Sequence, residues 1–179
     1  MRLAESCFST GAKNLAIVIT NGADFVLANN GPYFDPPGAN TTVCTQCLDV
    51  VGGTFTCRGP EYQEWFVRRC FDAMNGRDSG TLGEAHALNT VAEHRCVGLT
   101  VETRPDVFDR GQIERALRLG ATRVELGVQI LDDDVLKGVD RGHGVREVID
   151  CTRDCKEHGL KVCYHLMPGL PGSDPENDM

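Results

Sequence analysis

Residues 97–101, VGLTV, form an uncharged run rich in β-branched side chains, and the polar residues Glu102 to Arg104 follow it directly. A continuous apolar run of this length is typical of a parallel strand that is buried on both faces. Polar groups placed where such a strand ends are typical of a site at the carboxyl edge of a parallel sheet or barrel. The pattern therefore predicts a buried strand that delivers Glu102 and Arg104 to a site.

The same layout recurs along the chain. Residues 48–54, LDVVGGT, end in paired glycines, and residues 122–129, TRVELGVQ, end in Gln129. Residues 161–172, KVCYHLMPGLPG, pass through His165 into a loop of prolines and glycines. Strands whose polar ends converge on one edge predict an enzyme-like site.

Helical patterns separate these strands. Pro60 begins a helix that Gly76 ends, and a capping box formed by Thr81 and Glu84 begins the next one. The apolar face of the first helix is predicted from its 3.6-residue period to consist of Tyr62, Trp65, Phe66, Cys70 and Ala73. Further helices are predicted over 112–119, from Asp132–Asp134 onward, and over 145–158. Strands alternating with helices through short connections predict an α/β fold with a parallel sheet and outer helices.

The first 47 residues have a different pattern. Residues 15–20 fit a strand, whereas residues 29–42 are rich in Asn, Gly and Pro and predict a loop. We therefore expect an atypical N-terminal segment over 1–47 and a partial barrel over 48–179. The chain ends soon after the last predicted strand, which we interpret as a C-terminal truncation of the barrel.

Charge and composition narrow the class of protein. The net charge of −8 argues against a general nucleic-acid binder, although a local basic track that includes Arg68 and Arg69 remains open. No apolar run approaches the roughly 20 residues that span a membrane, and no signal peptide is recognisable. Nine cysteines without a secretory signal indicate free thiols or metal ligands in a reducing, cytoplasmic environment.

Several strand-end residues are candidates for ligand binding. Gly52 and Gly53 would let the backbone approach a ligand closely, or they would form a plain tight turn. Glu102 could accept hydrogen bonds from a ribose, and Arg104 could hold a carboxylate, or the two could pair with each other. Gln129 shares a strand face with Glu125, whose alternative partner is Arg123 on the same face.

Three further segments leave alternatives open. Residues 167–172 form a rigid loop that either packs on a ligand or only connects elements. His165 is interpreted as a residue that lines the core. Arg141 and His143 lie in a loop between helices, as phosphate contacts or in a solvated turn.

The cysteines suggest one metal-ligand motif. Cys44 and Cys47 have the C-x2-C spacing of metal ligands and end five residues before Gly52. Cys7 and Cys57 are the candidates for a third ligand. Cys151 and Cys155 lie four residues apart on an amphipathic helix and are interpreted as ordinary positions on its face.

Taken in order, several motifs resemble the radical S-adenosylmethionine (SAM) domain of the Elongator catalytic subunit family, in its archaeal form. The motifs are GGTF at 52–55, the helix at 62–76, HRCVGLTVETRPD at 94–106, LGATRVELGVQ at 119–129, RGH at 141–143 and KVCYHLMPGLPGSD at 161–174. The resemblance implies a partial (β/α)6 TIM-like barrel that holds SAM beside a [4Fe–4S] cluster. It also implies modification of the wobble uridine of tRNA with acetyl-CoA, delivered through a second, acetyltransferase domain.

The resemblance assigns roles to individual residues. The implied SAM contacts are Gly52, Gly53, Thr54, Glu102, Arg104, Gln129, Met167 and Pro168. The expected cluster ligands are Cys44 and Cys47, with Cys7 or Cys57 as the third, whereas the family carries three cysteines further upstream of the glycine pair. Expected contacts to the anticodon region of tRNA are Arg68, Arg69, Arg141 and His143.

Three hypotheses follow from this comparison. The first is the radical SAM domain of a tRNA-modifying transferase, which we expect to be insufficient alone because the acetyltransferase domain is absent from this sequence. The second is a non-catalytic remnant of the barrel that cannot hold the cluster. The third is a small zinc-thiolate protein. Self-association is a further expectation, and a membrane is not expected as a partner.

Overall fold

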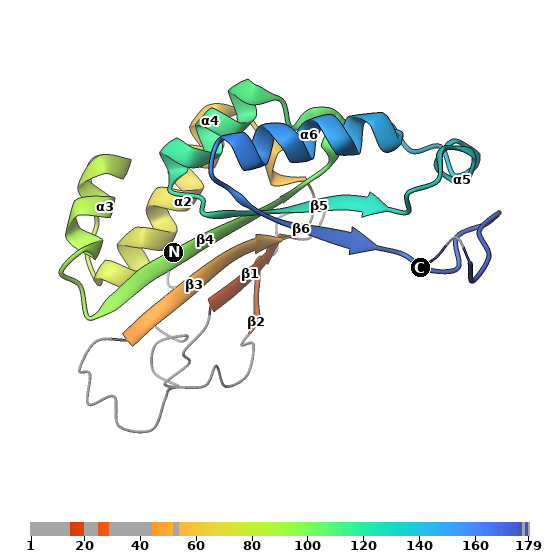
Figure 1. Ribbon diagram of the computed structural model, residues 1–179. Helices are drawn as coiled ribbons and strands as arrows, with labels where there is room; N and C mark the ends of the chain where they lie inside the picture. The colour runs from red at the N-terminus through yellow and green to blue at the C-terminus, as the bar shows by residue number, and fades with distance from the viewer. Residues whose placement is uncertain (1–14, 20–24, 29–43, 52–53, 177, 179) are drawn as a thin grey trace. The chain divides into compact units, whose positions relative to one another are not determined.

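A computed structural model describes residues 15–19, 25–28, 44–51, 54–176 and 178 (Figure 1). The chain forms two compact units, Met1–Thr100 and Val101–Met179. Their boundary falls within strand β4 (His94–Thr103), the strand predicted from the VGLTV run. Each unit is described separately below.

The strands of the first unit are arranged in the order β2-β1-β3-β4. Their bounds are β1 (Leu15–Ile19), β2 (Phe25–Ala28) and β3 (Cys44–Val51). β1 runs parallel to β3 and antiparallel to β2. The sheet is therefore mixed at this edge, which belongs to the N-terminal segment predicted to be atypical, and β2 lies where the sequence pattern did not predict a strand.

The helices of the first unit are the 3-10 helix η1 (Phe55–Cys57) and the α-helices α2 (Pro60–Asn75) and α3 (Leu82–Asn89). The α-helices begin where the sequence predicts, and α2 also ends there, whereas the 3-10 helix was not predicted and α3 ends at Asn89, before the predicted positions Val91 and Ala92. α2 starts at its proline and ends at Gly76, which adopts a φ of 68° that favours glycine. The Thr81 side chain accepts a hydrogen bond from the Glu84 backbone N–H, which caps α3.

The buried face of α2 differs from the prediction. Trp65 is 39% exposed, whereas the polar residues Gln63 and Asp72 are almost completely buried. Gln63 is accommodated because its amide donates hydrogen bonds to the carbonyls of Thr56 and Arg58, at 3.1 and 2.7 Å. Hydrophobic periodicity alone misplaced the face because hydrogen bonding allows polar side chains to be buried.

The second unit continues the alternation of strands and helices. Beyond β4 it contains η2 (Pro105–Val107), α4 (Arg110–Leu119), β5 (Arg123–Gln129), α5 (Asp133–Gly138), α6 (Val145–Glu157) and β6 (Lys161–Leu166). The strand order is β4-β5-β6, and β5 and β6 are parallel. These bounds match the predicted elements to within a few residues.

Helices α4 and α6 lie on one side of β5 and β6 (Figure 1). Alternate residues of β5, namely Val124, Leu126 and Val128, are completely buried. Burial of such side chains contributes about 1.5–3 kcal/mol each, so this face anchors the strand. The opposite face of β5 is free to carry polar residues.

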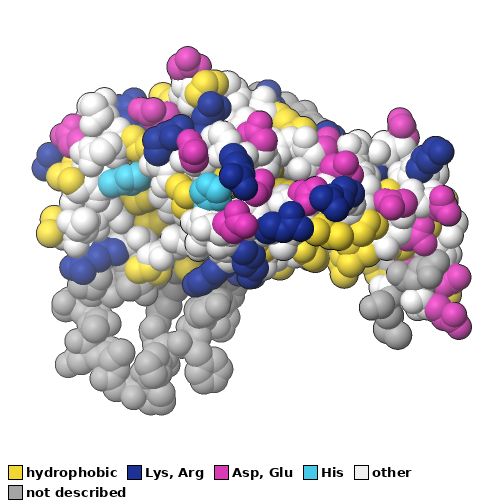
Figure 2. Space-filling model, turned by 45° about the horizontal axis from the view of Figure 1, so that its top comes forward, with side chains coloured by type: hydrophobic (Ala, Val, Ile, Leu, Met, Phe, Trp, Pro, Cys, Tyr) yellow, Lys and Arg dark blue, Asp and Glu magenta, His cyan; other side chains and the backbone are white. Residues whose placement is uncertain are grey.

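The outer surface of α6 is charged. In Figure 2, basic and acidic side chains are interspersed on the surface that is turned forward, which includes the outer side of α6. On the inner side of the helix, Cys151 and Cys155 are buried, which confirms that they are ordinary helix-face positions. Among the described residues, no helix is long and apolar enough to cross a membrane.

Candidate functional site

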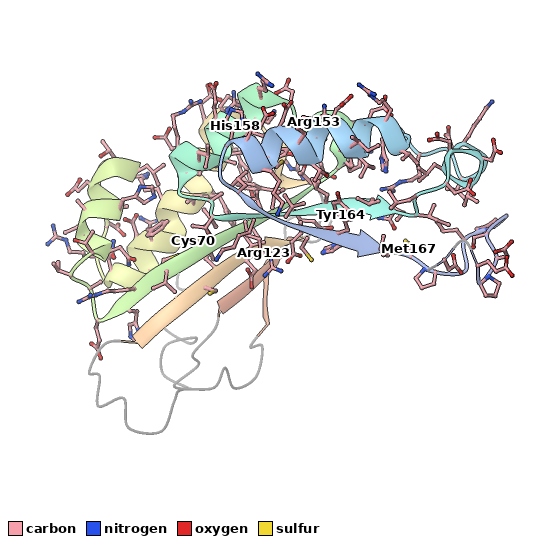
Figure 3. All side chains as sticks on the ribbon, viewed as in Figure 1. Cys70, Arg123, Arg153, His158, Tyr164 and Met167 are labelled. Carbon is pink, nitrogen blue, oxygen red and sulfur yellow. The ribbon has the colours of Figure 1, made fainter. Side chains whose placement is uncertain are left out.

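The face of β5 opposite the helices carries Arg123, Glu125, Gly127 and Gln129 at alternate positions. The guanidinium Nε of Arg123 lies 3.8 Å from Glu125 Oε1, as the shared face predicts. Figure 3 shows Arg123 at the start of the strand and Met167 just beyond the end of β6. The polar face therefore runs along β5 toward its carboxyl end.

His165 on β6 lies between two carboxylates from neighbouring strands. Its Nε2 is 2.7 Å from Glu125 Oε2, and its Nδ1 is 3.4 Å from Glu102 Oε1. The side chain is 37% exposed, so His165 is half-buried at the polar face of the sheet, and its interpretation as a core-lining residue stays a prediction. Sequence reasoning missed this cluster because its three members come from three strands and only their alignment brings them together.

Arg104 pairs with Asp106 in the turn after β4. Its Nε and Nη2 donate to the two carboxylate oxygens of Asp106, at 3.1 and 2.6 Å. Such a bidentate pair fixes the guanidinium plane. We therefore assign Arg104 to the support of the loop after β4, and a direct contact to a ligand carboxylate stays a prediction.

Gln129 Oε1, at the carboxyl end of β5, and Arg141 Nε, in the loop packed against it, are buried polar atoms without hydrogen-bond partners. Both side chains adjoin Gly127, where an added Cβ would lie 3.3 Å from Gln129 Nε2 and 3.6 Å from Arg141 Nη2. Buried polar groups are normally paired, so an orphaned acceptor beside an orphaned donor suggests a polar ligand. Gly127 leaves the space that a side chain would fill.

The loop 141–143 is packed against this strand end. Arg141 Nη2 donates to the Gly127 carbonyl at 3.0 Å, and His143 Nε2 lies 3.1 Å from the Val128 carbonyl. The His143 side chain is 0% exposed. The loop is thus not a solvated turn, and burial does not favour His143 as a direct tRNA contact.

The segment after β6 is hydrogen-bonded to the carboxyl end of β5. The Met167 backbone N–H donates to the Gln129 carbonyl at 2.8 Å, while the side chains of Met167 and Pro168 are exposed. Leu170 packs against a small core formed by Ile130, Val135 and Leu136. The start of the Pro/Gly loop is therefore positioned beside Gln129, and its contact with SAM stays a prediction.

Gly52 and Gly53 lie outside the described residues, so their assignment stays a prediction. Thr54, which follows them, adopts a left-handed backbone with a φ of 49° and precedes η1. A positive φ is uncommon for a β-branched residue and marks a constrained turn.

The described cysteines do not assemble a cluster site. Cys44 and Cys47 both belong to β3; Cys47 is exposed, as is Cys57, and Cys7 and the side chain of Cys44 lie outside the described part. Among the described residues, no group of three or more His, Cys, Asp or Glu side chains could hold a metal ion. Ligation by Cys44 and Cys47 therefore stays a prediction.

The buried thiols are also poor candidates for ligands of an iron–sulfur cluster. Burial raises the pKa of Cys96 to about 11 and raises the pKa of Cys70 further. A thiol must lose its proton to bind iron, so a raised pKa opposes ligation.

The two basic residues of α2 are engaged internally. Arg68 donates to the Ser79 carbonyl, and Arg69 Nη1 lies 2.8 Å from carboxylate oxygens of both Asp72 and Asp78. Their contact with tRNA stays a prediction, and the internal hydrogen bonds of both guanidinium groups do not favour it.

Residues 43–178 match the family described as the radical SAM superfamily. The chain belongs to this superfamily. Membership implies SAM and a [4Fe–4S] cluster as cofactors. The orphaned atoms beside Gly127 fit SAM, which carries hydrogen-bond donors and a carboxylate, whereas the described cysteines do not fit the cluster.

Curated relatives extend this assignment. The chain is 55% identical over 131 residues to the tRNA uridine(34) acetyltransferase of Methanocaldococcus jannaschii, a match that covers 73% of this chain and 24% of that protein. It is 53% identical over 132 residues to a protein of the same name from Dehalococcoides mccartyi, covering 74% and 29%. It is 40% identical over 130 residues to Elongator complex protein 3 of Drosophila melanogaster, covering 73% and 24%. The chain thus spans about a quarter of the length of these relatives.

A solved structure supports the fold of this radical SAM chain. The archaeal Elp3 of Methanocaldococcus infernus, with an N-terminal deletion, matches 74% of this chain and 31% of its own, with a TM-score of 0.73 and 53% identity. The radical SAM methyltransferase TsrM from Kitasatospora setae matches with a TM-score of 0.50 and 15% identity over 73% of this chain and 23% of its own, which bears on the fold alone. The predicted partial radical SAM barrel is confirmed.

Proposed function

We propose that the polar face of β4, β5 and β6 binds SAM, and that the chain is the SAM-binding part of an enzyme that modifies the wobble uridine of tRNA. The observation that carries the proposal is the pair of orphaned atoms, Gln129 Oε1 and Arg141 Nε, in two side chains that both adjoin Gly127. The names of the relatives support the choice of tRNA uridine 34 as the target.

The chemistry of SAM suits these groups. The Arg141 N–H would donate to its carboxylate, and the Gln129 oxygen would accept from an ammonium or hydroxyl group. Glu102, held by His165, would accept from the ribose hydroxyls. Arg141, predicted from sequence as a tRNA contact, is thereby proposed as a SAM contact.

SAM is the source of the radical chemistry in this superfamily. The residues of this chain would bind SAM, orient it along the strand ends and limit the access of water. Acetyl-CoA would be the second substrate, yielding carboxymethyluridine, in keeping with the acetyltransferase names of the relatives. The reaction would take place in the cytoplasm, on the anticodon region of tRNA.

Calorimetric titration of the full chain with SAM tests the proposal. Gln129→Ala and Arg141→Met should each weaken binding about tenfold, because each removes a hydrogen bond to a charged or polar ligand group. Gln112→Ala is a matched control, since Gln112 also carries a buried oxygen without a partner but lies on α4, on the other side of the sheet. Equal affinity in all variants, or no binding by the unmodified chain, would contradict the proposal.

Anaerobic reconstitution with iron and sulfide tests the cluster separately. Retention of about four irons per chain would support the enzyme, because a [4Fe–4S] cluster contains that number. Bound zinc without iron would favour the zinc-thiolate hypothesis. SAM binding with neither metal would leave a barrel that binds its ligand without a cluster.

A further inference from the structure

Three successive carbonyl groups at the end of β5 each receive a hydrogen bond from outside the strand. The Gly127 carbonyl accepts from Arg141 Nη2 at 3.0 Å, and the Gln129 carbonyl accepts from the Met167 N–H at 2.8 Å. Between them, the Val128 carbonyl lies 3.1 Å from His143 Nε2 and also accepts from the Ile130 N–H at 3.0 Å. A carbonyl only accepts hydrogen bonds, so His143 must donate through Nε2.

The backbone that these bonds hold is strained. Gln129 adopts a φ of 73°, which side chains other than glycine rarely take. The pairing of β5 with β6 also shifts register between Leu126 and Gln129. A conformation of this kind persists only where its surroundings enforce it, and it decides where the Gln129 side chain points.

The buried position of His143 lets it hold the strained backbone at Gln129 without contacting a ligand. Its side chain is 0% exposed, and Asp106 Oδ1 lies 3.8 Å from the other ring nitrogen, Nδ1. Asp106 itself accepts hydrogen bonds from Nε and Nη2 of Arg104. At Gly142, an added Cβ would come within 2.8 Å of Asp106 Oδ2, so the loop lies too close to this carboxylate for a side chain there.

We propose that His143 is a positioning residue. Its ring N–H holds the Val128 carbonyl and thereby keeps the strained end of β5 in the conformation that presents Gln129 to the ligand. The identity of that ligand as SAM rests on the proposed function, whereas the restraint on the strand end does not.

The first test is hydrogen exchange of the full chain without ligand. His143→Leu removes the donor and keeps bulk, and His143→Gln restores an N–H at a similar reach. The amides of Ile130 and Met167 should exchange at least about fivefold faster in the leucine variant, because local opening becomes easier, and should return toward the original rates in the glutamine variant. The amide of Leu160, which follows α6 and donates to the Cys155 carbonyl of that helix, serves as an internal control for folding. Unchanged exchange at Ile130 and Met167 would overturn the proposal.

The second test is SAM affinity measured by calorimetry. His143→Leu should weaken binding about tenfold, and the double variant with Gln129→Ala should bind no more weakly than Gln129→Ala alone. Additive losses would show that His143 does not act through Gln129. If the leucine variant does not fold, Gly142→Ala displaces the same loop and should give the same pattern of exchange and affinity. If the unmodified chain does not bind SAM, the proposed function fails, and the exchange rates still decide the role of His143.

Discussion

At the scale of single residues, the site depends on groups that are held by their neighbours. Glu102 and Glu125 would repel each other as carboxylates on adjacent strands, and His165 lies between them with a ring nitrogen toward each. The charge-assisted hydrogen bond between His165 Nε2 and Glu125 fixes orientation as well as contributing energy. His165 therefore helps to orient Glu102, the carboxylate that we propose as a ligand contact.

Replacing His165 with Leu should loosen this arrangement. We expect the free energy of unfolding to fall by about 1 kcal/mol, since the pairs are partly exposed and solvent weakens them. SAM affinity should fall as well, because Glu102 loses its contact with His165. Urea denaturation and calorimetry measure the two effects, and His165→Gln, which retains an N–H toward Glu125, should recover part of both. Wild-type stability and affinity in the leucine variant would rule out this role.

At the scale of helices and strands, local sequence signals predicted most boundaries, because caps and breakers act within a few residues. Pro60, Gly76, Gly120 and Gly159 all mark helix ends, and each of these glycines adopts a positive φ. The antiparallel strand β2 was missed because strand pairing is set by distant residues.

The partners of side chains were less predictable than the elements that carry them. Glu102 and Gln129 were recognised as strand-end residues, yet the pairing of Arg104 with Asp106 depends on the turn at η2. The burial of His143 depends on how the loop 141–143 packs against β5. Sequence periodicity carries no information about such contacts between elements.

Helix α6 provides a prediction on pH. Hydrogen bonds from Arg146 and then Arg153 lower the pKa of Asp150, and a hydrogen bond from Arg110 of α4 lowers the pKa of Asp154. A carboxylate whose pKa is lowered on folding stabilises the fold above its unfolded pKa of about 3.9, and this contribution disappears as the pH falls through the folded value. The urea midpoint should therefore fall as the pH is lowered from about 5 to about 2.

Asp154→Asn should reduce the size of that acid-dependent fall, because one of the shifted groups no longer titrates. Asp140→Asn is the control, since Asp140 is exposed, is not part of this ion-pair group and already adopts a positive φ that Asn tolerates. An equal acid-dependent fall in the Asp154 variant and the unmodified chain would show that the link between α4 and α6 does not matter for stability.

At the scale of the whole molecule, charge limits how this chain would meet the tRNA of the proposed function. The net charge is −8, and the basic residues predicted as tRNA contacts are bound to internal carbonyls and carboxylates or are buried. Affinity for a polyanion depends on the number of phosphates that cations neutralise, and it falls with salt in proportion to that number.

We therefore expect this chain to bind an anticodon stem-loop weakly and with a shallow salt dependence, corresponding to about three phosphate contacts or fewer. Fluorescence anisotropy over a range of salt concentrations measures the slope. Arg68→Gln should lower the stability of the fold, through loss of its bond to the Ser79 carbonyl, more than it lowers RNA affinity. Arg118→Gln is the matched control, because the Arg118 side chain is 66% exposed and its ion pair with Glu114, at 4.0 Å, is long. A steep salt slope that Arg68→Gln reduces by about one contact would instead establish α2 as a tRNA-binding surface, as the sequence predicted.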